Sequence, residues 1–261
     1  MKPKFFFGVL TILTLFISGC GGSRSEVPMA VVAEEAPKVD TARKTFDVST
    51  AGSLSGRVLF EGTAPEPKKI PVQGNPECAA LHPGGNIISE ELLVKNGGLA
   101  NAFVYVKEGL EAYSFEAPKE PAIISNSQCV YSPHVIGVRV NQDVVFLNND
   151  STLHNIHAYP KNNKAFNLGL PIVGMKQTRK FSAPELMIPL KCDVHPWMQG
   201  YIGVLAHPYF AVTDGDGNFQ IKNLPAGEYT LEAWHEKLGV QSQKIKIEPQ
   251  QTQNVEFKFK T

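Results

Sequence analysis

The segment Cys192-Asp-Val-His195-Pro-Trp-Met198, together with His154 lying 38 residues upstream, constrains this chain more than any other feature. It supplies one thiol, two imidazoles and one thioether. Copper prefers soft sulfur combined with imidazole, and two His, one Cys and a weak axial Met describe an electron-transfer copper site. A tight loop at a strand end can turn three of these ligands toward one point, and His154 can close the site from another loop. The alternatives are a zinc site, which rarely uses a thioether, and a loop with a structural role alone.

Two stretches of the chain, residues 131–157 and 192–204, resemble the type I blue copper proteins of the cupredoxin family, such as amicyanin and plastocyanin. The resemblance implies a Greek-key β-sandwich that holds one copper ion and transfers single electrons. Cys192 would be the thiolate ligand, His154 and His195 would bind through Nδ1, and Met198 would be the weak axial ligand.

The same resemblance suggests roles for the neighbours of the ligands. Asn155 is expected to tie the two ligand loops together by hydrogen bonds. Pro196 and Trp197 are expected beside an exposed edge of His195, which is the electron port in this family; simple packing is the alternative for Trp197. Amicyanin and plastocyanin have Pro two residues after the ligand Cys, whereas this chain has Val194, whose N–H can donate to the thiolate. Such a donor is expected to raise the midpoint potential.

The predicted ligand set leaves no evident open position for a substrate. For this reason we expect that the protein is not an enzyme. The function that we favour is an electron shuttle between a redox protein donor and acceptor, of the cytochrome or dehydrogenase class. A copper-holding or copper-delivery protein and a structural module of the cell envelope are the alternatives.

The first 19 residues are expected to be a secretory signal peptide. Lys2 and Lys4 precede an apolar run over residues 5–17, which is too short to span a membrane. Ile17-Ser-Gly-Cys20 resembles a bacterial lipobox, which would make Cys20 the lipidated first residue of a protein anchored in the periplasm. An ordinary signal with a chance Cys is the alternative.

Residues 20–51 show no clear periodicity and predict a flexible tether, with a typical reach of about 30 Å. Gly21 after the lipidated Cys implies the outer membrane, by resemblance to the sorting of bacterial lipoproteins. Without residues 1–19 the chain has 23 basic and 25 acidic residues, a net charge of about −2. This balance gives no support for a nucleic-acid partner.

Two cysteines remain once Cys20 is assigned to lipid and Cys192 to metal. In an exported protein, Cys78 and Cys129 are expected to form a disulfide. A second metal site is an alternative, because His82 and His134 follow these two cysteines closely. Two free thiols are a further alternative.

The remaining sequence predicts an all-β fold. Val255, Phe257 and Phe259 alternate with polar residues, as in a half-buried strand. The stretch from Thr213-Asp-Gly-Asp-Gly to Tyr229, with Gly56-Arg-Val-Leu-Phe60, resembles the carboxypeptidase regulatory-like, transthyretin-like sandwich. These pieces flank the copper segment, so we expect a discontinuous sandwich over 52–118 plus 207–261, with a cupredoxin domain over 120–206 inserted into it. The alternative is an N-terminal extension of the cupredoxin followed by an independent C-terminal sandwich.

Overall fold

The computed structural model describes residues 47–260; the predicted signal peptide, Cys20 and most of the tether lie outside the described residues. The described chain is almost entirely β-structure, with twenty strands, one α-helix and one 3-10 helix, Val48–Thr50. The predicted all-β fold with two β-sandwiches is confirmed. Within residues 47–260, no helix is long and apolar enough to cross a membrane.

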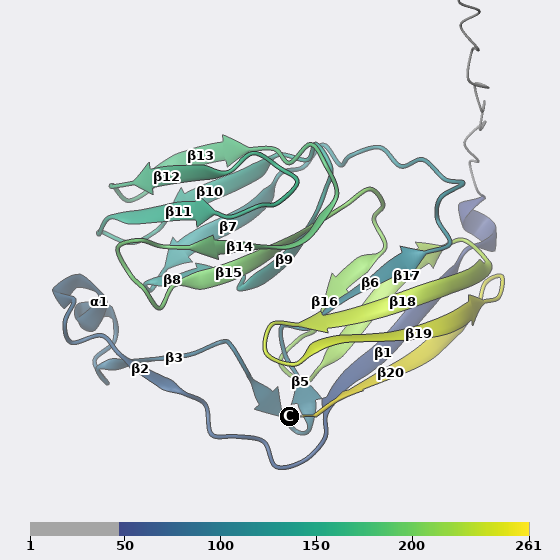
Figure 1. Cartoon of the computed structure of the whole chain (residues 1–261), viewed down its shortest axis with the longest axis horizontal. Coiled ribbons are helices and arrows are strands. Elements are labelled where there is room, and N and C mark those ends of the chain that lie inside the picture. Colours follow the sequence, from purple (N-terminus) through teal and green to yellow (C-terminus); the bar gives the residue numbers. More distant parts are fainter. Residues whose placement is uncertain (1–46, 261) are drawn as a thin grey trace, which may run out of the picture. The chain divides into compact units, whose positions relative to one another are not determined.

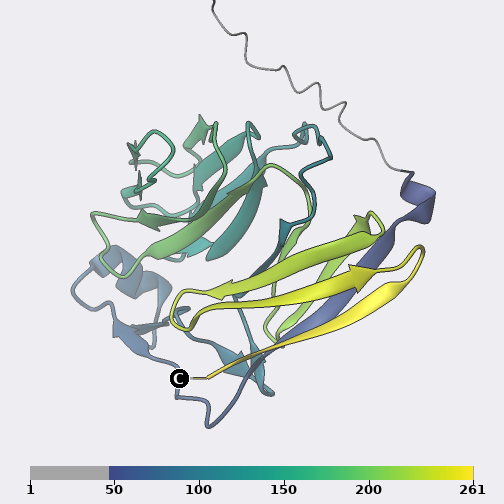
Figure 2. The same ribbon diagram turned by 45° about the vertical axis from the view of Figure 1, so that its right-hand side comes forward.

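One sandwich is built from strands that lie toward both ends of the described chain (Figure 1). Its core follows the predicted alternation, because Val255, Phe257 and Phe259 of β20 are buried whereas Glu256 and Lys258 are exposed. Strands β1 and β20 run side by side in parallel in both views (Figure 2). One sheet contains β17 (Asn218–Leu224), β1 (Gly52–Phe60), β5 (Gly98–Leu99), β4 (Val94–Lys95) and β20 (Thr252–Phe259). The other contains β16 (Phe210–Val212), β6 (Phe103–Glu108), β18 (Gly227–His235) and β19 (Gly239–Ile247).

The other sandwich comes from the middle of the chain. Ile124 and Phe146 from one of its sheets share a buried core with Ile156 and Leu190 from the other. The first sheet contains β13 (Lys176–Arg179), β10 (Val144–Asn148), β7 (Ala122–Ser127) and β8 (Val130–Ser132). The second contains β12 (Phe166–Leu170), β11 (His154–Ala158), β14 (Glu185–Lys191), β15 (Gln199–Leu205) and β9 (Val135–Arg139).

The strand pairing supports the proposal of a discontinuous sandwich. Strand β6 precedes the middle sandwich in the chain, yet it pairs with β16 and β18, which follow that sandwich. In the same way β1 pairs with β17 and β20. The links 109–121 and 206–209 join these strands to the middle sandwich along the chain. We therefore keep 52–118 plus 207–261, with 120–206 inserted, as the proposed division.

A small substructure between β1 and β4 packs on the middle sandwich, whereas its place in the chain falls within the range 52–118 predicted for the other sandwich. We call residues 69–88 the cap: β2 (Lys69–Pro71), α1 (Pro76–Leu81) and β3 (Asn86–Ile88), with β2 and β3 paired antiparallel. Val72, Cys78 and Ile87 of the cap are buried in the core of the middle sandwich. Cys78 is also joined to Cys129, in the turn between β7 and β8, by a disulfide. The cap is thus held to the middle sandwich both covalently and by packing.

Candidate metal centre

The predicted ligands lie at one end of the middle sandwich. Cys192 follows directly after β14, His195 and Met198 lie in the loop before β15, and His154 is the first residue of β11. The loop is tight, because the backbone N–H of Cys192 donates to the carbonyl of Met198 at 3.1 Å and that of Met198 to the carbonyl of His195 at 2.9 Å. The antiparallel pairing of β11 with β14 brings His154 to this loop.

Three of the predicted ligands come together in a buried cluster. Sγ of Cys192 and one ring nitrogen each of His154 and His195 all lie within 4.8 Å of one another. Nδ1 of His195 is 3.7 Å from Sγ of Cys192, and the two imidazole centroids are 4.7 Å apart. Met198 is buried in the same core cluster as Cys192. The structure therefore gathers one thiol and two imidazoles, with a thioether in the same loop.

The hydrogen bonds of His154 leave one ring nitrogen available. Its Nε2 is 2.9 Å from Oδ2 of Asp150. The same carboxylate accepts the backbone N–H of Gln128 at Oδ1 and that of Cys129 at Oδ2. Its Nδ1 is fully buried and has no hydrogen-bond partner among the described residues. A buried polar atom without a partner is costly, and a bound metal ion would satisfy it. The residues present therefore fit a metal held through Nδ1, the nitrogen that the family resemblance implies.

The charge state of the thiol also suits metal binding. Burial raises the pKa of the Cys192 thiol, but the rings of His154 and His195 and the backbone N–H groups of Asn155 and His195 outweigh burial and lower this pKa to about 6. The thiolate, which is the form that binds a metal, is then the main form at neutral pH. Burial also lowers the pKa of His154, but its contacts with Asp150 and Cys192 raise that pKa overall.

Asn155 connects the two ligand loops through its side-chain amide. Its Oδ1 accepts the backbone N–H of Asp193 at 2.7 Å and lies 3.3 Å from Sγ of Cys192. Its Nδ2 donates to Asn167 and to Asp193. The hydroxyl of buried Tyr131 donates to the Asn155 carbonyl at 2.5 Å, a contact for which the sequence carries no local signal.

The side chain of Val194 is exposed, and the backbone groups that lower the thiol pKa are those of Asn155 and His195. The predicted hydrogen bond from the Val194 N–H to the sulfur stays a prediction.

The expectation that His195 presents an exposed edge is wrong. His195 is 0% exposed, and its Nε2 lies 2.9 Å from Nδ2 of Asn75 in the cap. Pro196 is exposed, whereas Trp197 is half-buried and its indole N–H donates to the carbonyl of Cys129 at 3.0 Å. The cap covers this edge because the disulfide and its buried apolar side chains hold it there. Asn75 lies 120 residues before His195, so no local sequence pattern could have shown the contact.

The predicted Cys78–Cys129 disulfide is confirmed. The alternative metal site has its histidines elsewhere: Nε2 of His82 is 2.9 Å from the Gln128 carbonyl, and His134 is hydrogen-bonded to Glu236. The two cysteine sulfurs instead lie within 4.8 Å of a ring nitrogen of His195. The disulfide is therefore a direct neighbour of the candidate metal centre.

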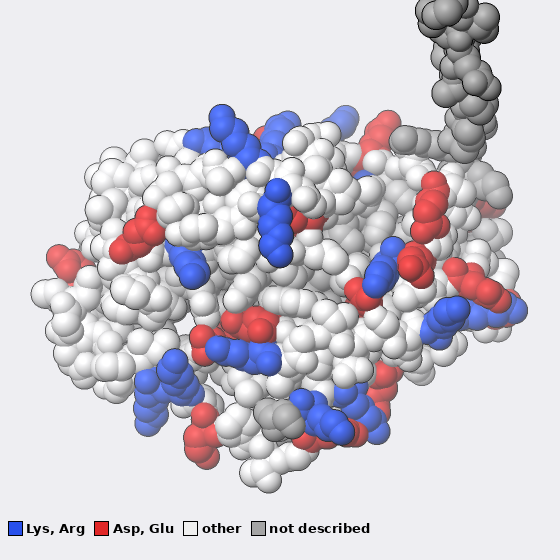
Figure 3. All heavy atoms as spheres, in the orientation of Figure 1, with Lys and Arg blue, Asp and Glu red and all other residues white. Residues whose placement is uncertain are grey.

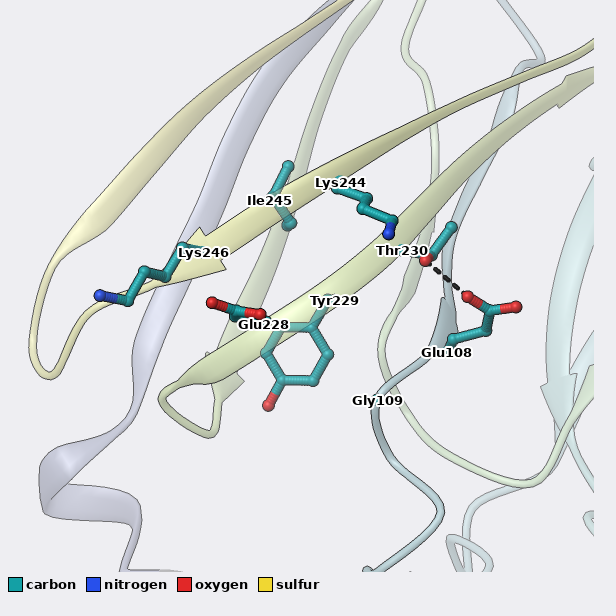
Figure 4. Close-up of a pocket in the computed structure, with 8 residues that line it drawn as sticks. All are labelled: Glu108, Gly109, Glu228, Tyr229, Thr230, Lys244, Ile245 and Lys246. Atoms are coloured by element: carbon teal, nitrogen blue, oxygen red, sulfur yellow. Dashed lines mark hydrogen bonds between the residues drawn. The ribbon is translucent and has the colours of Figure 1, made fainter.

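A separate hollow lies on the other sandwich, at the end of β6 and along β18 and β19 (Figure 4). Several of its polar side chains are engaged with protein groups: Thr230 donates to Glu108 at 2.6 Å, and the Tyr229 hydroxyl donates to the Pro225 carbonyl at 2.8 Å. Lys246 forms an ion pair with Glu248. None of the candidate ligands lines this hollow, and it gives no second candidate site.

Comparison with known proteins assigns part of the chain. Residues 204–260 match the family model of the carboxypeptidase regulatory-like domain. This match confirms the resemblance proposed for the C-terminal strands, although it covers less than half of the chain. No curated protein matches the sequence at a significant level.

The similar solved structures include several copper proteins. A copper-containing nitrite reductase from Thermus scotoductus is 21% identical, with 39% of this chain and 25% of that chain covered and a TM-score of 0.32. A purple cupredoxin from Nitrosopumilus maritimus is 28% identical, with 32% of this chain and 99% of that chain covered and a TM-score of 0.28. An amicyanin variant in its reduced Cu(I) form is 20% identical, with 34% of this chain and 87% of that chain covered and a TM-score of 0.30. The chain thus spans about a quarter of the nitrite reductase.

One expectation needs correction on this point. The ligand set led us to expect that the protein is not an enzyme, but the first of these structures is a copper nitrite reductase. The solved structures that the chain is similar to thus include a copper nitrite reductase as well as cupredoxins, and the expectation that the protein is not an enzyme is withdrawn.

Proposed function

We propose that the protein binds one type I copper ion through His154, Cys192, His195 and Met198 and transfers single electrons. The observation that carries the proposal is the buried, unpartnered Nδ1 of His154 beside the thiol of Cys192 and the ring of His195. When bound, copper would supply the reversible one-electron change between Cu(II) and Cu(I).

The protein residues contribute a buried ligand set that is held in place by hydrogen bonds. Asp150 fixes the ring of His154, and Asn155 fixes the Cys192 loop against β11. Because these ligands are almost completely buried, the surroundings can change little between the two oxidation states. A rigid site of this kind favours fast electron transfer, since little reorganisation accompanies it.

The visible spectrum of the copper-loaded protein tests this proposal. We expect an intense thiolate-to-copper charge-transfer band toward the red, which Cys192→Ser abolishes because serine cannot supply a soft covalent ligand. The double variant Cys78→Ser/Cys129→Ser is the matched control: it also exchanges sulfur for oxygen but keeps all four ligands, so the band should remain. Persistence of the band in Cys192→Ser, or binding of zinc alone, would contradict the site assignment.

The covered edge of His195 favours copper holding as the second candidate function. A site sealed by the cap retains a metal well but offers a redox partner less direct access. A reversible midpoint potential with fast self-exchange would support the electron carrier. Transfer of copper to an acceptor chelator faster than electron exchange would support the copper-holding function.

The location and partners are proposed from the sequence. Cys20 would carry lipid and anchor the protein at the periplasmic face of the cell envelope, in the outer membrane, with residues 20–51 as the tether. The partners would be redox proteins and not nucleic acids. Basic and acidic side chains are mixed over the face seen in Figure 3, which supports this choice. Labelling of the wild type but not of Cys20→Ala with a fatty acid would test the anchor.

A further inference from the structure

The cap reaches the candidate metal centre through the side chain of Asn75. This residue is the N-cap of α1, and its Oδ1 accepts the backbone N–H of Cys78 at 3.1 Å. Because the oxygen is used in this way, the amide nitrogen Nδ2 is the atom that faces Nε2 of His195, at 2.9 Å. The hydrogen-bond network therefore fixes the direction of the amide.

This direction decides where the His195 ring carries its proton. An amide NH₂ group only donates hydrogen bonds, so Nε2 of His195 must accept and cannot carry hydrogen. A neutral imidazole has one N–H, which then lies on Nδ1. Nδ1 is 3.7 Å from Sγ of Cys192, within reach of a sulfur acceptor. The contact with Asn75 is therefore compatible with a His195 ring that has no metal bound to Nδ1.

A metal bound to Nδ1 requires the opposite tautomer. Nδ1 then gives its lone pair to the metal, and the proton of the neutral ring lies on Nε2. That N–H would point at the N–H of Asn75, and two donors cannot share a contact of 2.9 Å. Either the Asn75 amide turns over, which removes the helix cap from Cys78, or the start of α1 moves away.

We propose that Asn75 is a metal-sensitive latch, which holds the cap on the metal-free centre and releases His195 when Nδ1 binds a metal ion. The inference rests on the proposed copper site and adds a positioning residue to it. Release of the latch would free the edge of His195, the edge that the closed cap hides.

The disulfide limits how far the cap can open. Cys78, three residues after Asn75, is bonded to Cys129, whose backbone N–H donates to Asp150. Nε2 of His82, just after α1, contacts the Gln128 carbonyl. The end of the helix is therefore fixed to the β7–β8 turn, and only its first residues, around Asn75, can withdraw.

Two substitutions of Asn75 separate the latch from other effects on metal binding. Asn75→Ser keeps a capping oxygen and removes the amide donor, while Asn75→Asp replaces the donor with an acceptor. Both should bind Cu(I) about fivefold or more tighter than the wild type, the effect of one hydrogen bond, in competition with a colorimetric Cu(I) chelator. Asn86→Asp is the control, because it adds the same charge on an exposed part of the cap and should leave the affinity unchanged.

The tautomer gives a readout that needs no copper. In the metal-free wild type, nitrogen NMR of the His195 ring should find the proton on Nδ1, and a proton on Nε2 would overturn the latch. Addition of Cu(I) should speed hydrogen exchange at residues 75–78. If the wild type binds copper with the expected spectrum but the two Asn75 variants bind it no tighter, the latch alone is wrong. If the wild type binds no copper, both the latch and the proposed function are wrong.

Discussion

The carboxylate of Asp150 holds the ring of His154 through a contact of 2.9 Å between Oδ2 and Nε2. The same carboxylate accepts the backbone N–H groups of Gln128 and Cys129, each at 2.8 Å. One buried side chain thus links a proposed metal ligand to the turn that contains the disulfide. Orientation of a ligating His by a carboxylate at its second nitrogen is a common device of metal sites.

Replacement of this carboxylate should weaken metal binding. We expect Asp150→Asn to lower copper affinity by about ten- to hundredfold, because one amide oxygen cannot serve all three donors or hold the ring as firmly. Competition with a chelator measures the change. Asp143→Asn is the control, since the side chain of Asp143 is 42% exposed and forms an ion pair with Lys180. An Asp150→Asn affinity equal to that of the control would contradict the orienting role.

The parts of the site that lie close in sequence could be predicted from it. The ligand loop was predictable because its short spacing leaves Cys192, His195 and Met198 on one turn, and β20 because its apolar residues alternate. Asp150 had a weak signal, as an acidic residue four positions before His154. Asn75 had none.

Long-range contacts account for most of what the sequence did not show. The link between Asn75 and His195 depends on the cap packing against the middle sandwich, which the sequence placed in the other sandwich. For the same reason, the exposed edge of His195 was predicted wrongly. The disulfide was predicted by assigning the other two cysteines first, and its position beside the candidate metal centre came only from the structure.

Loss of the disulfide should destabilise the protein. The bond joins residues 51 positions apart, so it restricts the unfolded chain strongly. We expect the double variant Cys78→Ala/Cys129→Ala to lower the free energy of unfolding by about 2–4 kcal/mol, measured with urea. Reduction of the wild type with a dithiol should lower the free energy of unfolding by the same amount. The same treatment should not change the free energy of unfolding of the double variant. Equal stability of the reduced and oxidised wild type would show that the disulfide has no such role.

Stability should also fall on acidification, in part through His235. Burial lowers the pKa of this residue from 6.5 to about 4, because its ring is 1% exposed and its Nε2 has no hydrogen-bond partner among the described residues. The unfolded chain then binds a proton at a higher pH than the folded one. The contribution of neutral His235 to the free energy of unfolding is complete above pH 6.5. It is lost as the pH falls from there through about 4.

Urea unfolding at several pH values between 7 and 4 measures this effect. Between pH 7 and pH 4, the free energy of unfolding of the wild type should fall by up to about 3 kcal/mol more than that of His235→Leu. One pKa unit corresponds to about 1.4 kcal/mol. The leucine variant keeps the volume but cannot bind a proton. Parallel stability curves for the two proteins would assign the acid sensitivity to other groups, such as His207, whose pKa is lowered in the same direction.

The midpoint potential of the proposed copper site should depend on the backbone N–H of Val194. If the Val194 N–H donates to the Cys192 thiolate, it withdraws charge from the sulfur and favours Cu(I). Val194→Pro removes that donor and should lower the midpoint potential while keeping the charge-transfer band. Val194→Ala is the control, because it shortens the exposed side chain and keeps the N–H, so its potential should equal that of the wild type. Voltammetry of the three proteins decides the matter: an unchanged or raised potential in Val194→Pro would leave the backbone N–H groups of Asn155 and His195 as the donors that tune the sulfur.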